Sequence, residues 1–398
     1  MKKRSEQMQL HGRVMEAETI GKDGGKREYR INKRAFLIFE VYLLIFCVVS
    51  TILTSCKNGN GDPIGDENVD VYVAGYNDYG QAVLWKNGDP ISLSGGSIAN
   101  SVFVSESDVY ITGYEPSTTF GVKTVLWKNE NPTILAEEGS NTINSVFVAR
   151  GNVYVAGNNN DPNRNDDGAV LWKNGIPTIL TAGVKSESAS SVFVAGNDVY
   201  VTGAAWYNED VAGITSWVLP TLWKNGVPSI LTIPTHSNIG FSSCTAGSVF
   251  VANNNVYIVG VGTGGCSSNY RDITIAILWK NGIPTFLTDE NEEMFFNGQK
   301  LSEAYSVYVD GSDIYVAGAI GTFINNYSDI SWSATLWKNG VPIALDKNFY
   351  ATSVFVSGSD IYVVEGGNGA ILWKNGVSTY LSKEASAWPN SIFVAPRQ

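Results

Sequence analysis

Residues able to carry acid–base or metal chemistry are scarce in this sequence. Histidine occurs twice, at His11 and His236. A Ser-His-Asp triad or a histidine-based zinc site needs more than the single histidine that follows residue 55. Carboxylates remain, and a pair of them could act as acid and base on a polysaccharide. The candidates for such a pair are Glu209, Asp210, Asp272, Asp289, Glu290, Glu292, Glu293 and Asp329.

One polar stretch has the alternation of a calcium loop. Oxygen side chains stand at every second position, at Asp161, Asn163, Asn165 and Asp167, as they do in loops that bind Ca²⁺. The stretch lacks the glycine and the distal glutamate of an EF-hand, because Trp172 stands where that glutamate would be. The pattern is therefore compatible with a weak Ca²⁺ site and also with a solvated, Asx-rich turn. We expect no other cofactor.

The cysteines suggest two separate roles. Cys47 and Cys56 lie near the N-terminus, whereas Cys244 and Cys266 flank a predicted hairpin. The last two would emerge at the same end of that hairpin, and outside the cytoplasm they could form a disulfide. A pair of free thiols is the alternative.

Aromatic side chains gather in long predicted loops. Flat rings near Asp, Asn and Arg can stack on sugar faces while the polar groups bond hydroxyls, and exposed aromatic residues often mark binding sites. The alternative is that these rings pack within their own loops as small satellite clusters. The candidate ligand-binding residues are Trp206, Tyr207, Trp217, His236, Phe241, Tyr270, Arg271 and Trp332.

A repeat positions these loops. Leu-Trp-Lys-Asn occurs seven times, at spacings of roughly 36–58 residues, which is typical of repeat architectures. The stretch 145–180 reads as four short strands: Ser-Val-Phe-Val, then Val-Tyr-Val-Ala-Gly, then Ala-Val-Leu-Trp, then Pro-Thr-Ile-Leu. Asn174-Gly175 between the last two is a strong type I′ hairpin signal. Each repeat is thus predicted to be an antiparallel meander.

The pattern of the strands predicts a closed ring. Three strands of each repeat are apolar on both faces and must be covered on both sides, while proline in the fourth fits an outer edge. The first repeat lacks a Ser-Val-Phe-Val strand, and Ser391-Ile-Phe-Val394 can supply it. The sequence therefore predicts an all-β fold: a seven-bladed β-propeller of four-stranded antiparallel blades, with the C-terminal strand completing the first blade.

The two faces of such a propeller differ. On one, which we call the tight face, the turns are short and every blade presents the lysine of Leu-Trp-Lys-Asn. Five of the seven lysines should pair with an aspartate on the adjacent strand. On the other, the variable face, loops differ in length and are longest in blades four to six. We expect function on the variable face.

The segment from about Val69 to Val394 resembles bacterial β-propeller repeat proteins with these three strand motifs. The resemblance implies a propeller and no defined activity. Leu53-Thr54-Ser55-Cys56, after a basic flank and an apolar run, resembles a bacterial lipoprotein signal. That resemblance implies cleavage before Cys56 and lipid attachment to its thiol. An uncleaved transmembrane helix is the alternative, although Glu40 interrupts the run.

Together these patterns divide the chain into a signal peptide (1–55), a flexible tether (56–68) and a propeller (69–398). The formal charge of −11 argues against a nucleic-acid partner. We expect a monomeric lipoprotein, anchored in the cell envelope at the outer membrane or cell surface, that binds a glycan or protein through the long loops of blades four to six. A polysaccharide-active enzyme and a non-binding envelope scaffold are the alternatives.

Overall fold

A computed structural model describes residues 5–10, 13–23, 26–30, 64 and 68–397, with gaps in the last range at 118–120, 138–141, 160–167, 181–185, 207–217, 236–238, 267–271, 289–299, 325–328 and 348. The chain forms two compact parts, Met1–Asn60 and Gly61–Gln398. In the first, β1 (Ser5–Leu10), β2 (Arg13–Asp23) and β3 (Lys26–Arg30) form a three-stranded sheet. No helix among the described residues is long and apolar enough to span a membrane.

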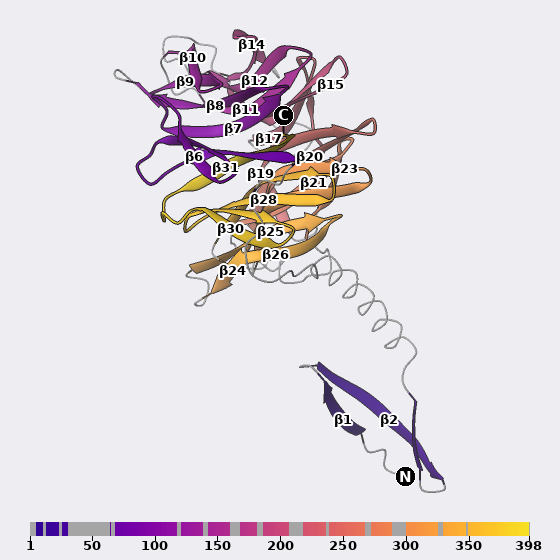
Figure 1. Cartoon of the computed structure of the whole chain (residues 1–398). Coiled ribbons are helices and arrows are strands. Elements are labelled where there is room, and N and C mark those ends of the chain that lie inside the picture. The colour runs from indigo at the N-terminus through magenta and orange to yellow at the C-terminus, as the bar shows by residue number, and fades with distance from the viewer. Residues whose placement is uncertain are drawn as a thin grey trace. The chain divides into compact units, whose positions relative to one another are not determined.

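The second part consists of repeated antiparallel meanders (Figure 1). Repeat 1 comprises β31 (Trp388–Pro396), β4 (Val69–Tyr76), β5 (Ala82–Lys86) and β6 (Asp89–Ser92). Repeat 2 comprises β7 (Ile98–Ser105), β8 (Asp108–Pro116), β9 (Val122–Lys128) and β10 (Asn131–Ala136). Repeat 3 comprises β11 (Thr142–Ala149), β12 (Asn152–Asn159), β13 (Gly168–Lys173) and β14 (Ile176–Leu180).

Repeats 4 to 7 follow the same order. Repeat 4 comprises β15 (Ser186–Ala195), β16 (Asp198–Trp206), β17 (Val218–Lys224) and β18 (Val227–Ile230). Repeat 5 comprises β19 (Ile239–Ala252), β20 (Asn255–Cys266), β21 (Asp272–Lys280) and β22 (Ile283–Phe286). Repeat 6 comprises β23 (Lys300–Asp310), β24 (Asp313–Ile324), β25 (Asp329–Lys338) and β26 (Val341–Lys347). Repeat 7 comprises β27 (Tyr350–Ser357), β28 (Asp360–Gly366), β29 (Ala370–Lys374) and β30 (Val377–Ser382).

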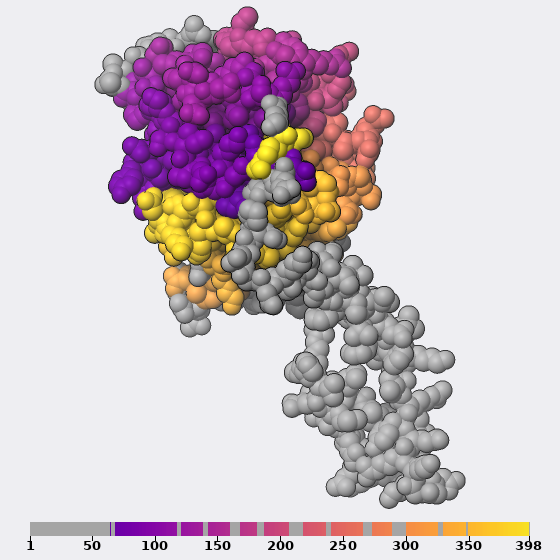
Figure 2. Space-filling model, in the orientation of Figure 1, coloured from indigo at the N-terminus to yellow at the C-terminus, as the bar shows by residue number. Residues whose placement is uncertain are grey.

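The prediction of an all-β fold made of four-stranded antiparallel sheets is confirmed. Five sheets have four strands, and repeats 4 and 5 share an eight-stranded sheet through one parallel residue pair, Val218 and Ser243. The C-terminal strand β31 pairs with β4, which begins more than 300 residues earlier in the sequence. Figure 2 shows these C-terminal residues (yellow) against the first strands of the second part (indigo).

The tight hairpins follow from residues that tolerate positive φ. Asn87 and Gly88 have φ of 51° and 90°, as a type I′ turn requires. The asparagine also closes the turn, because its Oδ1 accepts the N–H of Val71 on the neighbouring strand at 2.8 Å. Equivalent bonds of 2.8–2.9 Å occur in all seven repeats. In repeat 2, Glu130 adopts the glycine position with φ of 68°.

Successive repeats are joined by the serine of Ser-Val-Phe-Val. Its Oγ accepts a backbone N–H from the next repeat at 3.2–3.4 Å. The donor is the valine or isoleucine directly after that repeat's own motif serine. The sequence of bonds returns to its start: Val146 to Ser101, Val192 to Ser145, Val249 to Ser191, Val307 to Ser248, Val354 to Ser306, Ile392 to Ser353 and Val102 to Ser391. Each of the seven repeats therefore bonds both neighbours.

The aromatic residue of the same motif makes a second set of contacts. Neighbouring rings have centroids 4.6–4.9 Å apart and are tilted by 47–54°, a favourable aromatic arrangement. The contacts run from Phe103 through Phe147, Phe193, Phe250, Tyr308, Phe355 and Phe393 back to Phe103. The first strands thus meet through both backbone and side chains.

The tryptophan of Leu-Trp-Lys-Asn packs between sheets. Six of the seven are at most 2% exposed: Trp85, Trp127, Trp172, Trp223, Trp279 and Trp337. Only Trp373 is half-buried. The fourth strands lie at the sheet ends, and six of them carry proline at the second position, opposite this tryptophan. At that position an amide N–H would point away from the sheet, so proline removes a free edge donor.

Candidate functional site

The tight face carries the predicted charge pairs. Lysine and aspartate from adjacent strands form ion pairs in five repeats, as antiparallel pairing of these strands predicts. The Nζ–Oδ2 distances are 3.1 Å for Lys86–Asp70, 2.7 Å for Lys128–Asp108, 2.7 Å for Lys224–Asp198, 2.9 Å for Lys338–Asp313 and 3.3 Å for Lys374–Asp360. In repeats 3 and 5, Asn152 and Asn255 accept a bond from the turn asparagine instead.

Each of these lysines also lies over a tyrosine ring in its own repeat. The Nζ–centroid distances are 5.2–5.6 Å in all seven repeats, within cation–π range. The lysines are thus engaged by the fold itself. These Lys, Tyr and Asp side chains therefore stabilise the repeat itself, and the paired lysines offer little free charge to a ligand.

Asp70 has additional partners because β31 lies beside it. Burial alone would raise the pKa of its carboxyl, but hydrogen bonds from Asn87, Lys86 and Arg397 outweigh burial and lower this pKa to about 2. Arg397 reaches it with Nε at 3.0 Å. The C-terminal segment is therefore tied to repeat 1 by charge as well as by strand pairing.

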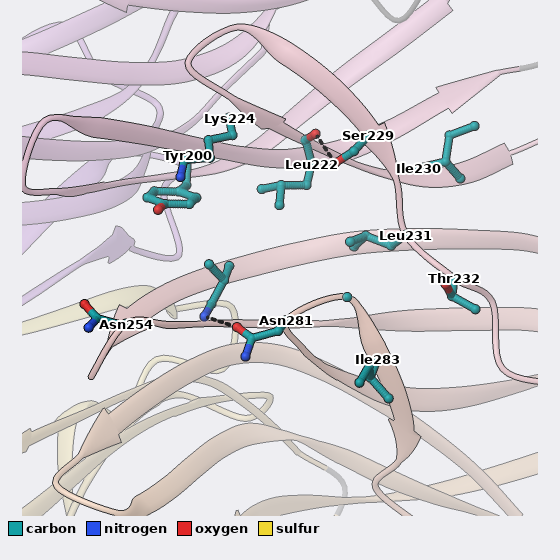
Figure 3. Close-up of a pocket in the computed structure, with 12 residues that line it drawn as sticks. Tyr200, Leu222, Lys224, Ser229, Ile230, Leu231, Thr232, Asn254, Asn281 and Ile283 are labelled. Carbon is teal, nitrogen blue, oxygen red and sulfur yellow. Dashed lines mark hydrogen bonds between the residues drawn. The ribbon is translucent and has the colours of Figure 1, made fainter.

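A groove of ≈ 600 Å³ opens between repeats 4 and 5 (Figure 3). Its walls are Leu222, Ile230 and Leu231 on one side and Val256 and Ile283 on the other. The polar groups along it are already used. Ser229 donates to the Leu222 carbonyl at 3.1 Å, and the side-chain oxygen of Asn281 accepts the Val256 N–H at 2.9 Å. A smaller groove of ≈ 130 Å³ has equivalent residues between repeats 1 and 2, so such grooves belong to the joints between repeats.

The variable face contains part of the predicted aromatic set. Trp206 ends β16 and is 41% exposed. Phe241 stacks on Phe286 with centroids 6.2 Å apart. Phe241 and Trp332 both pack against one buried cluster, formed by Ile273, Ile275 and Leu301. The structure therefore brings together aromatic residues of repeats 5 and 6, and Trp206 is not a member of that cluster.

Several predicted site residues lie outside the described residues. They are Tyr207, Trp217, His236, Tyr270 and Arg271 of the aromatic set, Asp161, Asn163, Asn165 and Asp167 of the calcium motif, and the lipidation candidate Cys56. In the part of the chain that the structure describes, no three His, Cys, Asp or Glu side chains gather as metal ligands. These site assignments stay predictions.

The predicted Cys244–Cys266 disulfide is not formed. Cys244 is a buried free thiol, and burial raises its pKa to about 12. The strand register explains this, because Cys244 lies opposite Gly262 whereas Cys266 lies opposite Ile239. Strands β19 and β20 continue beyond the expected hairpin, so Cys244 stands within a strand and not at the end of the sheet.

A row of aromatic side chains crosses three neighbouring repeats on the variable face. Trp332 of repeat 6 contacts Tyr350 of repeat 7 at 5.3 Å between centroids, and Tyr350 contacts Trp388 of repeat 1 at 6.0 Å. All three are half-buried, so each keeps some surface open to solvent. We call Trp332, Tyr350 and Trp388 the aromatic row.

Polar groups lie beside the aromatic row. The Tyr305 hydroxyl donates to a carboxylate oxygen of Glu303, and its ring is 6.4 Å from that of Tyr350. Burial raises the pKa of Tyr305, and the bond to Glu303 raises it further. Burial likewise raises the pKa of Tyr350, with a contribution from the charge of Glu303. Both phenols are therefore held in the neutral, hydrogen-bonding form.

The sequence contained a signal for this row. Tyr350 and Trp388 occupy the same position, the first residue of the first strand and three residues before the serine of the repeat motif. Repeats 2 and 3 have Ile98 and Thr142 there. Comparing repeats position by position, and not by loop length, would have selected both aromatic residues.

No protein-family model and no curated protein sequence matches the chain. Similar solved structures include the polysaccharide lyase Uly1, at 11% identity and a TM-score of 0.41 over 74% of this chain and 82% of that one. An ulvan lyase of polysaccharide lyase family 25 has 12% identity and a TM-score of 0.42 over 81% and 96% of the two chains. The WD40 β-propeller domain of Doa1 has 16% identity and a TM-score of 0.38 over 75% and 90%.

Proposed function

We propose that residues 69–397 form a closed seven-bladed β-propeller that binds a glycan through the aromatic row. Closure is supported by the serine bonds and aromatic contacts that pass through seven first strands and return to the start. Strand exchange between β31 and β4 supports it too. A rigid ring of this kind suits a binding module, because its surface is preorganised.

The aromatic row is the observation that carries the binding assignment. Three half-buried rings from three repeats offer apolar faces, and Glu303 and Tyr305 beside them can bond hydroxyl groups. Apolar surface with a few placed polar groups is the usual composition of a small-molecule site. A glycan has apolar ring faces that can stack on the aromatic row and hydroxyls that can bond Glu303 and Tyr305. A protein ligand is the alternative, and a pull-down with the full chain, run beside the glycan array, would test it.

The binding test compares the full chain with aromatic-row variants on a glycan array, followed by titration of any glycan bound. We expect Trp388→Ala to weaken binding at least about tenfold, equivalent to about 1.4 kcal/mol, and Trp388→Phe to keep most of the affinity. Tyr79→Ala is the matched control, because Tyr79 is 79% exposed and lies in the loop after β4. Equal affinity of the Trp388→Ala and Tyr79→Ala variants would remove the aromatic row from the site.

We further propose that Cys56 carries a lipid anchor. The sequence supports this, because Leu53-Thr54-Ser55-Cys56 follows a basic flank and an apolar run, and acyl chains on this cysteine would give lasting membrane attachment.

Fractionation of cells that produce the full chain tests the anchor. The wild type should be found with membranes and should incorporate labelled fatty acid, because acyl chains give lasting attachment. Cys56→Ala should lose the label, whereas Cys47→Ala, a cysteine within the leader, should retain it. Label on the Cys56→Ala protein would disprove the assignment.

A further inference from the structure

One repeat position carries an exceptional residue. In six repeats it is glycine, and a Cβ there would lie 1.7–2.1 Å from a carbonyl oxygen of the first strand; these glycines are Gly75, Gly113, Gly157, Gly203, Gly260 and Gly318. In repeat 7 the position is Glu365. The register is otherwise the same, since Glu365 lies opposite Ala351 as Gly75 lies opposite Pro389. Repeat 7 thus has a carboxyl side chain at a position where the other six repeats have no side chain.

The carboxyl of Glu365 is enclosed and only half bonded. The residue is 0% exposed. Its Oε2 accepts the Nε1–H of Trp373 at 2.6 Å, and its Oε1 has no hydrogen-bond partner among the described residues. Burial raises the pKa of this carboxyl to about 7 and outweighs the hydrogen bond from Trp373, which lowers it; the charge of Asp346 on β26 raises it further. Charging a buried group without a compensating partner is costly.

Trp373 is altered by this bond. In two other repeats the same nitrogen donates to a carbonyl just before the repeat, from Trp127 to Ser94 at 3.2 Å and from Trp279 to Thr232 at 2.7 Å. In repeats 4 and 6 the nitrogens of Trp223 and Trp337 are buried with no partner among the described residues. Trp373 bonds Glu365 of its own repeat instead and is less buried than the other six. The joint between repeats 6 and 7 therefore depends on the state of one carboxyl.

Glu365 is also next to the aromatic row. The following residue, Gly366, lies opposite Tyr350 in the β27–β28 ladder. Gly366 is so close to the Trp388 ring that a Cβ on it would be 2.6 Å from Cδ2. A shift of the β28 end at Glu365 is thus transmitted directly to two of the three rings.

We propose that Glu365 is a protonation switch that sets the position of the aromatic row and hence its affinity for ligand. This regulation rests on the glycan-binding function proposed above. With a proton, Glu365 is neutral and the joint is closed. Without it, an unpaired negative charge lies near Asp346 of β26, and the end of β28 moves to reach solvent. Glu303 acts on Tyr350 of β27 and not on Glu365.

The direction of the effect follows from proton binding. The carboxyl has an ordinary value of 4.5 and a folded pKa of about 7, so the folded chain holds a proton that the unfolded chain releases. Stability is therefore greatest at low pH within this window, falls as pH rises from 4.5 to 7, and is constant above it. Across this window the unfolding equilibrium constant should rise by up to about 300-fold.

The test uses the full chain, with urea unfolding and tryptophan fluorescence measured from pH 5 to pH 9. Glu365→Gln keeps the acceptor for Trp373 without the charge and should abolish the Glu365 component of the pH profile. Asp346→Asn removes a negative charge near Glu365 and should move the midpoint of the pH-dependent loss of stability to lower pH. Glu384→Gln, at an exposed carboxyl, should match the wild type. Identical profiles for the wild type and Glu365→Gln would overturn the proposal.

The ligand measurement completes the test. For a glycan found on the array, affinity should fall across the same pH range in the wild type and stay constant in Glu365→Gln. A pH-dependent stability with a pH-independent affinity would overturn the regulatory role. If the array finds no glycan, the proposed function fails, whereas the unfolding and fluorescence profiles still report whether the carboxyl switches the joint.

Discussion

Deleting residues 388–398 should abolish cooperative folding of the second part of the chain. The deletion removes β31, whose Ile392 and Val394 are 4% exposed and pack in the core beside β4. Burial of such a side chain is worth about 1.5–3 kcal/mol. With Phe393, the serine bonds and the β4 pairing also lost, the sum approaches the about 5–15 kcal/mol that stabilises a typical protein.

Circular dichroism during thermal unfolding measures this effect. The deleted chain should show no sharp transition, while the intact chain should show one. Removing only Arg397 and Gln398 is the control, because it loses the Asp70 contact and keeps the whole of β31. A sharp transition at the wild-type temperature in the chain without β31 would show that repeat 1 does not need this strand.

Replacing Trp223 with alanine should destabilise the folded chain by about 3–5 kcal/mol. Trp223 is 0% exposed and packs in the core between repeats 3 and 4. Its Nε1 is buried without a hydrogen-bond partner among the described residues. Phenylalanine fills much of the same space, so Trp223→Phe should cost clearly less than Trp223→Ala.

Urea unfolding of the variants gives the free energies. Trp206→Ala is the matched control, because Trp206 is 41% exposed at the end of a strand in the same repeat, and exposed substitutions are usually within about 0.5 kcal/mol. If Trp223→Ala and Trp206→Ala proved equally stable, the packing role of the repeat tryptophans would be refuted.

Features fixed by neighbouring residues in sequence could be predicted well. The Asn-Gly turns are set by adjacent residues, and each Asp–Lys pair joins the start of the second strand to the end of the third strand of the same repeat, so both follow from the strand motifs. Apolar runs on both strand faces similarly indicated sheets covered on both sides. The two hairpins of each meander followed directly, because short turns leave their strands no other pairing.

Features that depend on joints between repeats were harder to predict. The aromatic row combines residues of repeats 6, 7 and 1. Tyr350 and Trp388 begin first strands, whereas Trp332 lies in a third strand, so no single motif of the repeat links the three. Cys244 was misplaced because β19 and β20 continue beyond the expected hairpin, so that Cys244 lies within β19. Loop length alone placed the candidate binding site on repeats 4 to 6. Unusual residues at fixed repeat positions, such as Glu365, instead draw attention to repeats 6 and 7.

The pairing of β31 with β4 also governs the order of events during synthesis. Repeats 2 to 7 can each form once their own residues have emerged, since their strands are consecutive. Repeat 1 must wait, with an open edge on β4, until the residues of β31 have been made. Contacts between such distant segments form slowly, and exposed strand edges invite aggregation meanwhile. Repeat 1 is therefore exposed to aggregation through the open edge of β4 until β31 has been synthesised and has paired with it.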